Sequence, residues 1–316
     1  MRRGDIAHLG LMLAALLLAY LLPLELVVLS YAVLGPAHYL TEISWLHDRG
    51  YYLPGRKTPI ALAFVALGAM FIASPYWYGV AVFTAFAACA VMTAKSQGVR
   101  ALLTLGATML IAGMLFLQAP FAIVGALMPT LVHVSLFTLV FMVLGALRTR
   151  TAAQFGLVGV YLLSIVLILA APPSEATRIP ALQGLAQTSF SDIPKAIGAT
   201  LRLPDLSFDG RIAGLLSFVY TYHYLNWFIK AEVIRWADIP RRRLIAVVAL
   251  SLAASVFYFV DYKLGFTVLL LLSLLHVLLE FPLNTLALRE LGARLGGAMP
   301  RHAAAGPVAA GNRRRG

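Results

Sequence analysis

The stretch that decides the fold is FTVLLLLSLLHVLLEFPLNTLALR, residues Phe266–Arg289. It exceeds the roughly 20 apolar residues that a helix needs to cross a bilayer, yet His276 and Glu280 stand near its middle. Residues four positions apart share one face of a helix, and an ionisable pair inside hydrocarbon is costly enough to indicate function. The same spacing occurs in HYLTE, where His38 precedes Glu42.

Composition extends this interpretation to the whole chain. Of its 316 residues, 61% are hydrophobic and 12% are charged, whereas a soluble domain carries about 25% charged residues. A fold in water cannot hide this much apolar surface, so we expect lipid to surround the protein. The sequence therefore predicts an all-α, polytopic transmembrane helical bundle that forms a single unit over residues 1–295.

We count ten apolar stretches of membrane-spanning length, which predict about ten transmembrane helices. They are Ile6–Leu22, Leu24–Leu46, Pro59–Ala73, Tyr76–Ala94, Val99–Leu117, Phe121–Leu147, Ala153–Ala171, Ile212–Trp236, Leu244–Val260 and Phe266–Leu288. Pro23 breaks the chain between the first two. These two are either separate crossings, or a kinked hairpin or partly re-entrant pair.

The basic residues predict the orientation. In a ten-span topology, 20 of the 25 Lys and Arg residues fall at the N-terminus, in alternate loops or after the last span, as the positive-inside rule expects of the cytoplasmic side. Both termini are therefore predicted to be cytoplasmic. The net charge of +12 is explained in this way, so we expect no nucleic-acid partner. We expect an integral membrane protein of the prokaryotic inner (cytoplasmic) membrane.

Two segments fall outside the spans. The long connection 172–210 is predicted on the outer side, where Ser191 and Asp192 can cap a short amphipathic helix with Pro194 in its first turn. That helix would lie on the membrane surface or form a lid over the bundle. The tail 296–316 is basic and lacks hydrophobic periodicity, so we expect it to be disordered.

Four histidines occupy comparable depths in the predicted topology. His38, His133, His223 and His276 each lie on an even-numbered span, 11 to 15 residues before an arginine at its inner end (Arg49, Arg148, Arg235 and Arg289). At about 1.5 Å per residue these separations are roughly 16–23 Å, a scatter that helix tilt can absorb. We therefore predict that the four imidazoles converge on one point. Pro36 and Pro129 precede two of them and are expected to kink their spans and make room for a ligand.

These residue types favour a metal centre. Imidazole suits iron, copper and zinc, and added carboxylates favour a harder ion such as iron. Glu42 and Glu280 would either bind the metal themselves or accept a hydrogen bond from the imidazole N–H that faces away from the metal, which fixes the orientation of the ring. The predicted metal ligands are His38, Glu42, His133, His223, His276 and Glu280, and the predicted catalytic residues nearby are Tyr222, Tyr224 and Asn226.

The first functional hypothesis is a membrane oxidoreductase with non-haem iron, which uses oxygen to oxidise a lipid or isoprenoid. Its partners would be membrane lipid and a lipid-soluble small-molecule substrate. A second hypothesis is a membrane protein that binds haem between paired histidines. A third is a proton-coupled transporter or channel that uses the histidines and glutamates as a relay. A purely structural role for the six residues is the fourth.

Several membrane-embedded histidines on separate spans resemble two kinds of polytopic protein at the level of architecture. One is the carotenoid-cleaving, retinal-forming membrane oxygenase, and the other is haem A synthase, which has four histidines on alternate spans. The resemblance implies either oxygen-dependent cleavage of a lipid-soluble substrate or haem binding. This chain lacks the histidine-rich local motifs of the first, and it has HxxxE where the second has a carboxylate ahead of the histidine.

Overall fold

The computed structural model describes residues 3–50, 57–72, 74–117, 128–174, 179–190, 209–230 and 239–296. These residues are almost entirely helical and include no strand, which confirms the all-α prediction. Seven helices are long and apolar enough to cross a membrane by length and composition. This result is compatible with an integral membrane protein. The count of ten spans and the cytoplasmic termini stay predictions.

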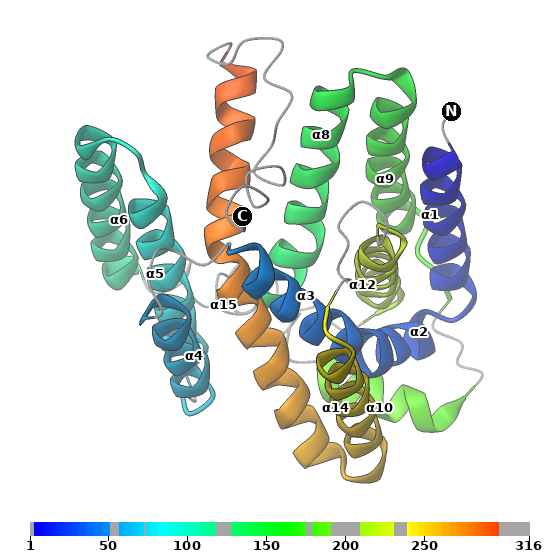
Figure 1. Ribbon diagram of the computed structural model, residues 1–316. Helices are drawn as coiled ribbons and strands as arrows, with labels where there is room; N and C mark the ends of the chain where they lie inside the picture. The colour runs from blue at the N-terminus through cyan, green and yellow to red at the C-terminus, as the bar shows by residue number, and fades with distance from the viewer. Residues whose placement is uncertain are drawn as a thin grey trace.

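The described residues form a series of helices (Figure 1). The first half contains α1 (Arg3–Leu21), α2 (Pro23–Leu29), η1 (Ser30–Leu34), α3 (Gly35–Arg49), α4 (Lys57–Ala69), α5 (Pro75–Thr93) and α6 (Gln97–Leu117). The second half contains η2 (Met128–Phe137), α8 (Thr138–Thr149), α9 (Ala152–Ala170), α10 (Pro180–Phe190), α12 (Gly210–Ile229), α14 (Arg241–Val260) and α15 (Tyr262–Leu295).

Three predicted spans are not among the seven candidates. Helix α4 and the Gln97–Gly113 part of α6 are apolar but shorter. Helix α12 has sufficient length, but its Tyr, His and Asn residues make it less apolar. At the N-terminus, α1 and the continuous helix Pro23–Arg49 are two candidate spans by length and composition, and whether they make separate crossings or a kinked or re-entrant pair stays a prediction.

Helices α12 and α15 form the centre of the bundle. Helix α12 packs against α1, α2, α9 and both π-helical segments, η1 and η2, and 14 of its residues are buried. Helix α15 packs against α3, α4, α5, α8 and α14. By contrast, α6 lies at the edge of the bundle (Figure 1) and exposes Leu102, Met109 and Phe116. An apolar outer face of this kind is suited to contact with acyl chains.

The two ends of the bundle differ in charge. The start of α1, the turn between α8 and α9, and the end of α15 lie at the same end of the molecule, and α10 and the α14–α15 turn lie at the other (Figure 1). At the first end, Arg148 and Arg294 both bind Glu290. The helix ends and turns thus fall into the two groups that the sequence predicts as inner and outer loops.

Helix α15 is longer than the predicted span, with 34 residues instead of a stretch ending at Leu288. At about 1.5 Å per residue it measures roughly 51 Å, more than the roughly 30 Å of a hydrocarbon core. Its final turns carry Arg289, Glu290 and Arg294, and the ion pairs of Glu290 give these turns a tertiary partner outside the apolar stretch. Hydropathy marks only the part of a helix that lies in lipid.

The outer connection contains a helix that the sequence did not reveal. Helix α10 precedes the predicted amphipathic segment at residues 191–201, which lies outside the described residues, as does the tail from residue 297. The carboxylate of Glu25, which is buried, accepts a hydrogen bond from the backbone N–H of Ile179 at the start of α10. Phe190 at the end of α10 packs edge-on against Tyr31. Helix α10 therefore packs against the η1 and α2 end of the bundle.

Helices α14 and α15 approach too closely for any side chain at Gly265. A Cβ atom built there would lie 2.3 Å from the Cα of Tyr258, so Gly265→Ala must force the two backbones apart. We expect Gly265→Ala to lower stability by about 1–3 kcal/mol through overpacking, measured as a lower midpoint of thermal unfolding in neutral detergent.

Gly292→Ala on the same helix is the matched control, because no atom lies within 4 Å of its built Cβ. Alanine favours the helix over glycine, so this variant should be neutral or slightly more stable. An unchanged midpoint for Gly265→Ala would contradict the close approach.

Candidate metal centre

Two π-helical segments position two of the four histidines. Segment η1 ends immediately before Gly35, whose N–H bonds to the carbonyl of Ser30, five residues back, and His38 follows in the first turn of α3. His133 lies within η2 itself. Pro36 and Pro129, which lack an N–H, disfavour regular α-helical bonding at these places. π-helical turns are rare and occur often at functional sites.

The four imidazoles meet, as the depth argument predicted. The ring centroids of His38 and His223 are 4.7 Å apart, and those of His133 and His276 are 4.9 Å apart. The two pairs lie side by side, with centroids 5.4 Å apart between His38 and His276 and also between His133 and His223. Within each pair the Nε2 atoms face each other at 3.1 Å.

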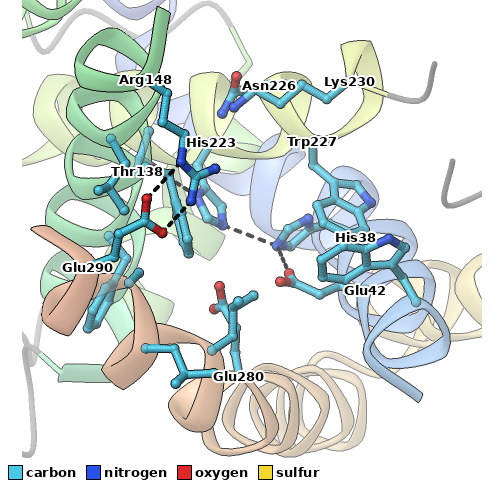
Figure 2. A pocket seen from close by; sticks show the side chains of 18 residues that line it. His38, Glu42, Thr138, Arg148, His223, Asn226, Trp227, Lys230, Glu280 and Glu290 are labelled. Carbon is cyan, nitrogen blue, oxygen red and sulfur yellow. Dashed lines mark hydrogen bonds and ion pairs between the residues drawn. The ribbon is translucent and has the colours of Figure 1, made fainter. Parts of the chain in front are cut away.

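Both carboxylates reach this group. An oxygen of Glu42 lies 3.0 Å from Nε2 of His38, one turn away on the same helix. An oxygen of Glu280 lies 3.4 Å from Nδ1 of His133, which is on a different helix. The two carboxyl groups are also close enough to interact with each other. Figure 2 shows Glu42 and Glu280 projecting toward the same space from α3 and α15.

Three of these residues form a compact set of donors. One nitrogen each from His38 and His276 and one oxygen of Glu42 all lie within 4.8 Å of one another, and all three residues are buried. This group can bind a metal ion. His133, His223 and Glu280 supply a second pair of imidazoles and a second carboxylate beside it.

Several polar atoms of the cluster have no hydrogen-bond partner within the described residues. They are Nδ1 of His38 and of His276, and also Nδ1 of His133 and the Glu280 oxygen 3.4 Å from it, a contact that lacks hydrogen-bond geometry. Buried polar groups are normally hydrogen-bonded, and exceptions point to an ion or water that belongs there. Within the described residues, no Lys or Arg forms an ion pair with Glu42 or Glu280.

Neighbouring side chains hold the rings in place. The hydroxyl of Thr138 lies 2.7 Å from Nδ1 of His223, so the opposite nitrogen of that ring faces His38. The ring of Tyr39 stacks on His276 at a centroid distance of 4.3 Å. Its hydroxyl is 2.6 Å from the hydroxyl of Tyr224. These contacts restrict the rings in orientation, as metal-binding histidines require.

The three predicted catalytic residues do not share one location. Tyr224 lies beside the cluster, with its ring centroid 4.9 Å from that of His38. Asn226 lines the adjoining pocket, and its buried amide oxygen has no hydrogen-bond partner in the described part of the chain. Tyr222 lies apart from the cluster: it packs against Tyr161 and its hydroxyl faces the sulfur of Met142. Side chains two positions apart on an α-helix point about 200° apart around its axis, so Tyr222 faces away from the side that carries Tyr224.

Sequence reasoning missed three supporting residues. Thr138 and Thr41 gave no signal, because the contacts of Thr138 with His223 and of Thr41 with the indole N–H of Trp227 join distant helices. Asn284 did give a sequence signal, because it continues the four-residue spacing of His276 and Glu280 on α15. In the structure it is fully buried. It lies one turn beyond Glu280, and neither polar atom of its amide has a hydrogen-bond partner within the described residues.

A pocket of about 330 Å³ opens from the cluster. His38, Glu42, His223 and Glu280 line one end, and Arg148, Lys230 and Glu290 line the other. Figure 2 shows these two groups of side chains around the same space.

A scan against known protein families, a search of curated proteins and a search of solved structures each found no match to this chain. Conclusions about function therefore rest on the geometry and chemistry of this cluster.

We expect Thr138→Val, which keeps the size of the side chain but removes its hydroxyl, to release the ring of His223. Loss of a partner that orients a metal-binding histidine lowers metal affinity by about 10- to 100-fold. The affinity of the purified protein for Fe²⁺, measured by competition with a chelator, tests this expectation.

Thr267→Val on α15 is the control, because the hydroxyl of Thr267 bonds only to a backbone carbonyl one turn away on an exposed surface. Equal affinities for the two variants would show that Thr138 has no part in metal binding.

Proposed function

We propose that this chain is a membrane oxidoreductase that binds non-haem iron between its histidines and glutamates and oxidises a lipid-soluble substrate with oxygen. The basic residues at one end of the bundle support an inner, cytoplasmic membrane location, where the positive-inside rule operates.

The charge of the cluster supports this proposal most strongly. Glu42 and Glu280 are buried among apolar helices with no Lys or Arg paired to either in the described part of the chain. A buried carboxylate without a compensating charge is strongly unfavourable. A metal cation would supply the compensating positive charge and would also use the imidazole nitrogens that face one another.

The donor types favour iron. Two imidazoles and one carboxylate, as in His38, His276 and Glu42, make up the set that non-haem Fe(II) oxygenases use, with further coordination positions left open. His133, His223 and Glu280 repeat this composition, and helical bundles build two-metal sites from such paired sets. Bound here, iron would supply the capacity to activate oxygen.

The spacing of the imidazoles is less suited to haem. Two axial nitrogens on one iron are about 4 Å apart, twice a metal–nitrogen bond of about 2 Å, and the macrocycle lies between the two rings. Here the paired Nε2 atoms are 3.1 Å apart and the second pair of rings is in direct contact with the first. A planar macrocycle would have to displace these contacts.

The remaining residues of the site have roles that follow from their positions. Tyr39 and Tyr224 hold the ring of His276 through stacking and a shared hydrogen bond. Asn226 presents an unpartnered amide oxygen to the pocket. The apolar pocket walls would bind a lipid-soluble substrate and exclude water from the reaction.

Metal content and the absorption spectrum test the proposal. The protein purified in neutral detergent should contain at least one iron per chain and should lack a Soret band. His38→Ala and His276→Ala should each lower the bound iron several-fold or more, because each removes one of three donors.

His47→Ala is the matched control. His47 lies on α3 like His38, but it is exposed near the end of that helix, so iron content should not change. A Soret band would favour the haem hypothesis. Protein without metal, or iron that survives both substitutions, would refute the proposed centre and favour a proton relay.

A further inference from the structure

The pocket beside the cluster has two chemically different ends. Its walls between these ends are apolar and include Phe141, Leu144, Leu283 and the indole rings of Trp45 and Trp227. On α15 the pocket extends from Glu280 to Glu290, which corresponds to about 15 Å at 1.5 Å per residue. On α12 it extends from His223 to Lys230, or about 10 Å by the same measure.

Among the described residues, the end remote from the histidines carries an excess of positive charge. Glu290 accepts bonds from both Arg148 and Arg294, so its single negative charge is shared between two cations. Lys230 lines the same end of the pocket. Within the described part of the chain, more positive than negative side chains therefore lie where the pocket ends, and an anion there would be stabilised.

Asn226 gives a second and independent indication of a ligand. Its side chain is only 8% exposed, lines the pocket one turn before Lys230, and has an amide oxygen with no hydrogen-bond partner among the described residues. Leaving a buried amide oxygen without a partner is unfavourable. A ligand with a polar group at this level would satisfy it.

We propose that this pocket binds a single-chain amphiphile whose anionic head group, a carboxylate or a phosphate, lies at Lys230 and Arg148 and whose apolar chain reaches the histidines. The proposal rests on the proposed function only in taking the cluster as the reactive centre. The reacting carbon would then lie about 10–15 Å from the anionic group. The volume of 330 Å³ is near the lower limit of ligand pockets, about 300 Å³, and fits one chain rather than a bulky or double-chained lipid.

Tryptophan fluorescence offers a direct test, because Trp45 and Trp227 line the pocket with ring centroids 5.4 Å apart. Bromine quenches an indole that it approaches. The full chain in phosphatidylcholine nanodiscs would be titrated with bromododecanoate, bromododecyl phosphate and the neutral bromododecanol. At least one anionic probe should quench with an affinity about 10-fold or more above that of the alcohol, since hydrogen bonds to charged groups contribute about 1.5–3 kcal/mol.

Variants at Lys230 identify the head-group site. Lys230→Gln should weaken binding of the anionic probe about 10-fold and leave the alcohol unchanged, whereas Lys230→Arg should restore binding of the anion. Lys95→Gln is the matched control, because Lys95 is exposed and does not line the pocket. Selective binding of the carboxylate would indicate a fatty-acid-like substrate, and selective binding of the phosphate would indicate a lipid phosphate.

Equal affinity for the anionic and neutral probes, or anion binding that is indifferent to Lys230→Gln, would overturn the proposal. These outcomes are independent of the metal, because each titration is repeated after treatment with a chelator. Selective anion binding to protein that never contains iron would support this inference and refute the proposed function. Protein that contains iron but does not bind anions selectively would support the proposed function and refute this inference.

Discussion

The structure depends on one electrostatic constraint, the burial of two carboxylates and three imidazoles, with the half-buried imidazole of His223 beside them, in the middle of an apolar bundle. Removing a charged group from water costs several kcal/mol even after relaxation, so these residues are tolerated only where they compensate one another or share a cation. That requirement brings four helical segments to one point. Helices α3 and α15 each supply a histidine and a glutamate, while η2 and α12 each supply a histidine.

The irregular parts of the helices serve the same requirement. Segments η1 and η2 occur at or beside His38 and His133, and in each case a proline follows or lies within the segment. A π-helical turn changes which side chains face inward after it. The π-helical segments therefore occur where the imidazoles must point toward one another. Helices α9 and α14, which carry no site residue, are α-helical along their whole length.

The cluster has different surroundings on its two sides. Toward the outer end, Tyr31, Tyr220 and Tyr258 are buried together, with Phe190 of α10 packed over Tyr31. Toward the other end, the pocket leads to the charged side chains of α8, α12 and α15. The pocket therefore joins the histidines to these charged side chains along apolar walls.

The sequence by itself determined the helical class, the lipid environment and the convergence of His38, His133, His223 and His276, because hydropathy and helical rise are properties of single segments. Charge and spacing likewise identified Glu42 and Glu280. Only the tertiary structure decided that Tyr222 faces α8 and α9 while Tyr224 faces the histidines, that Thr138 orients His223, and that a pocket connects the cluster to Lys230. These features depend on how each helix is rotated about its axis. That rotation follows from packing against neighbours distant in the sequence and is weakly encoded where a helix is apolar on every side.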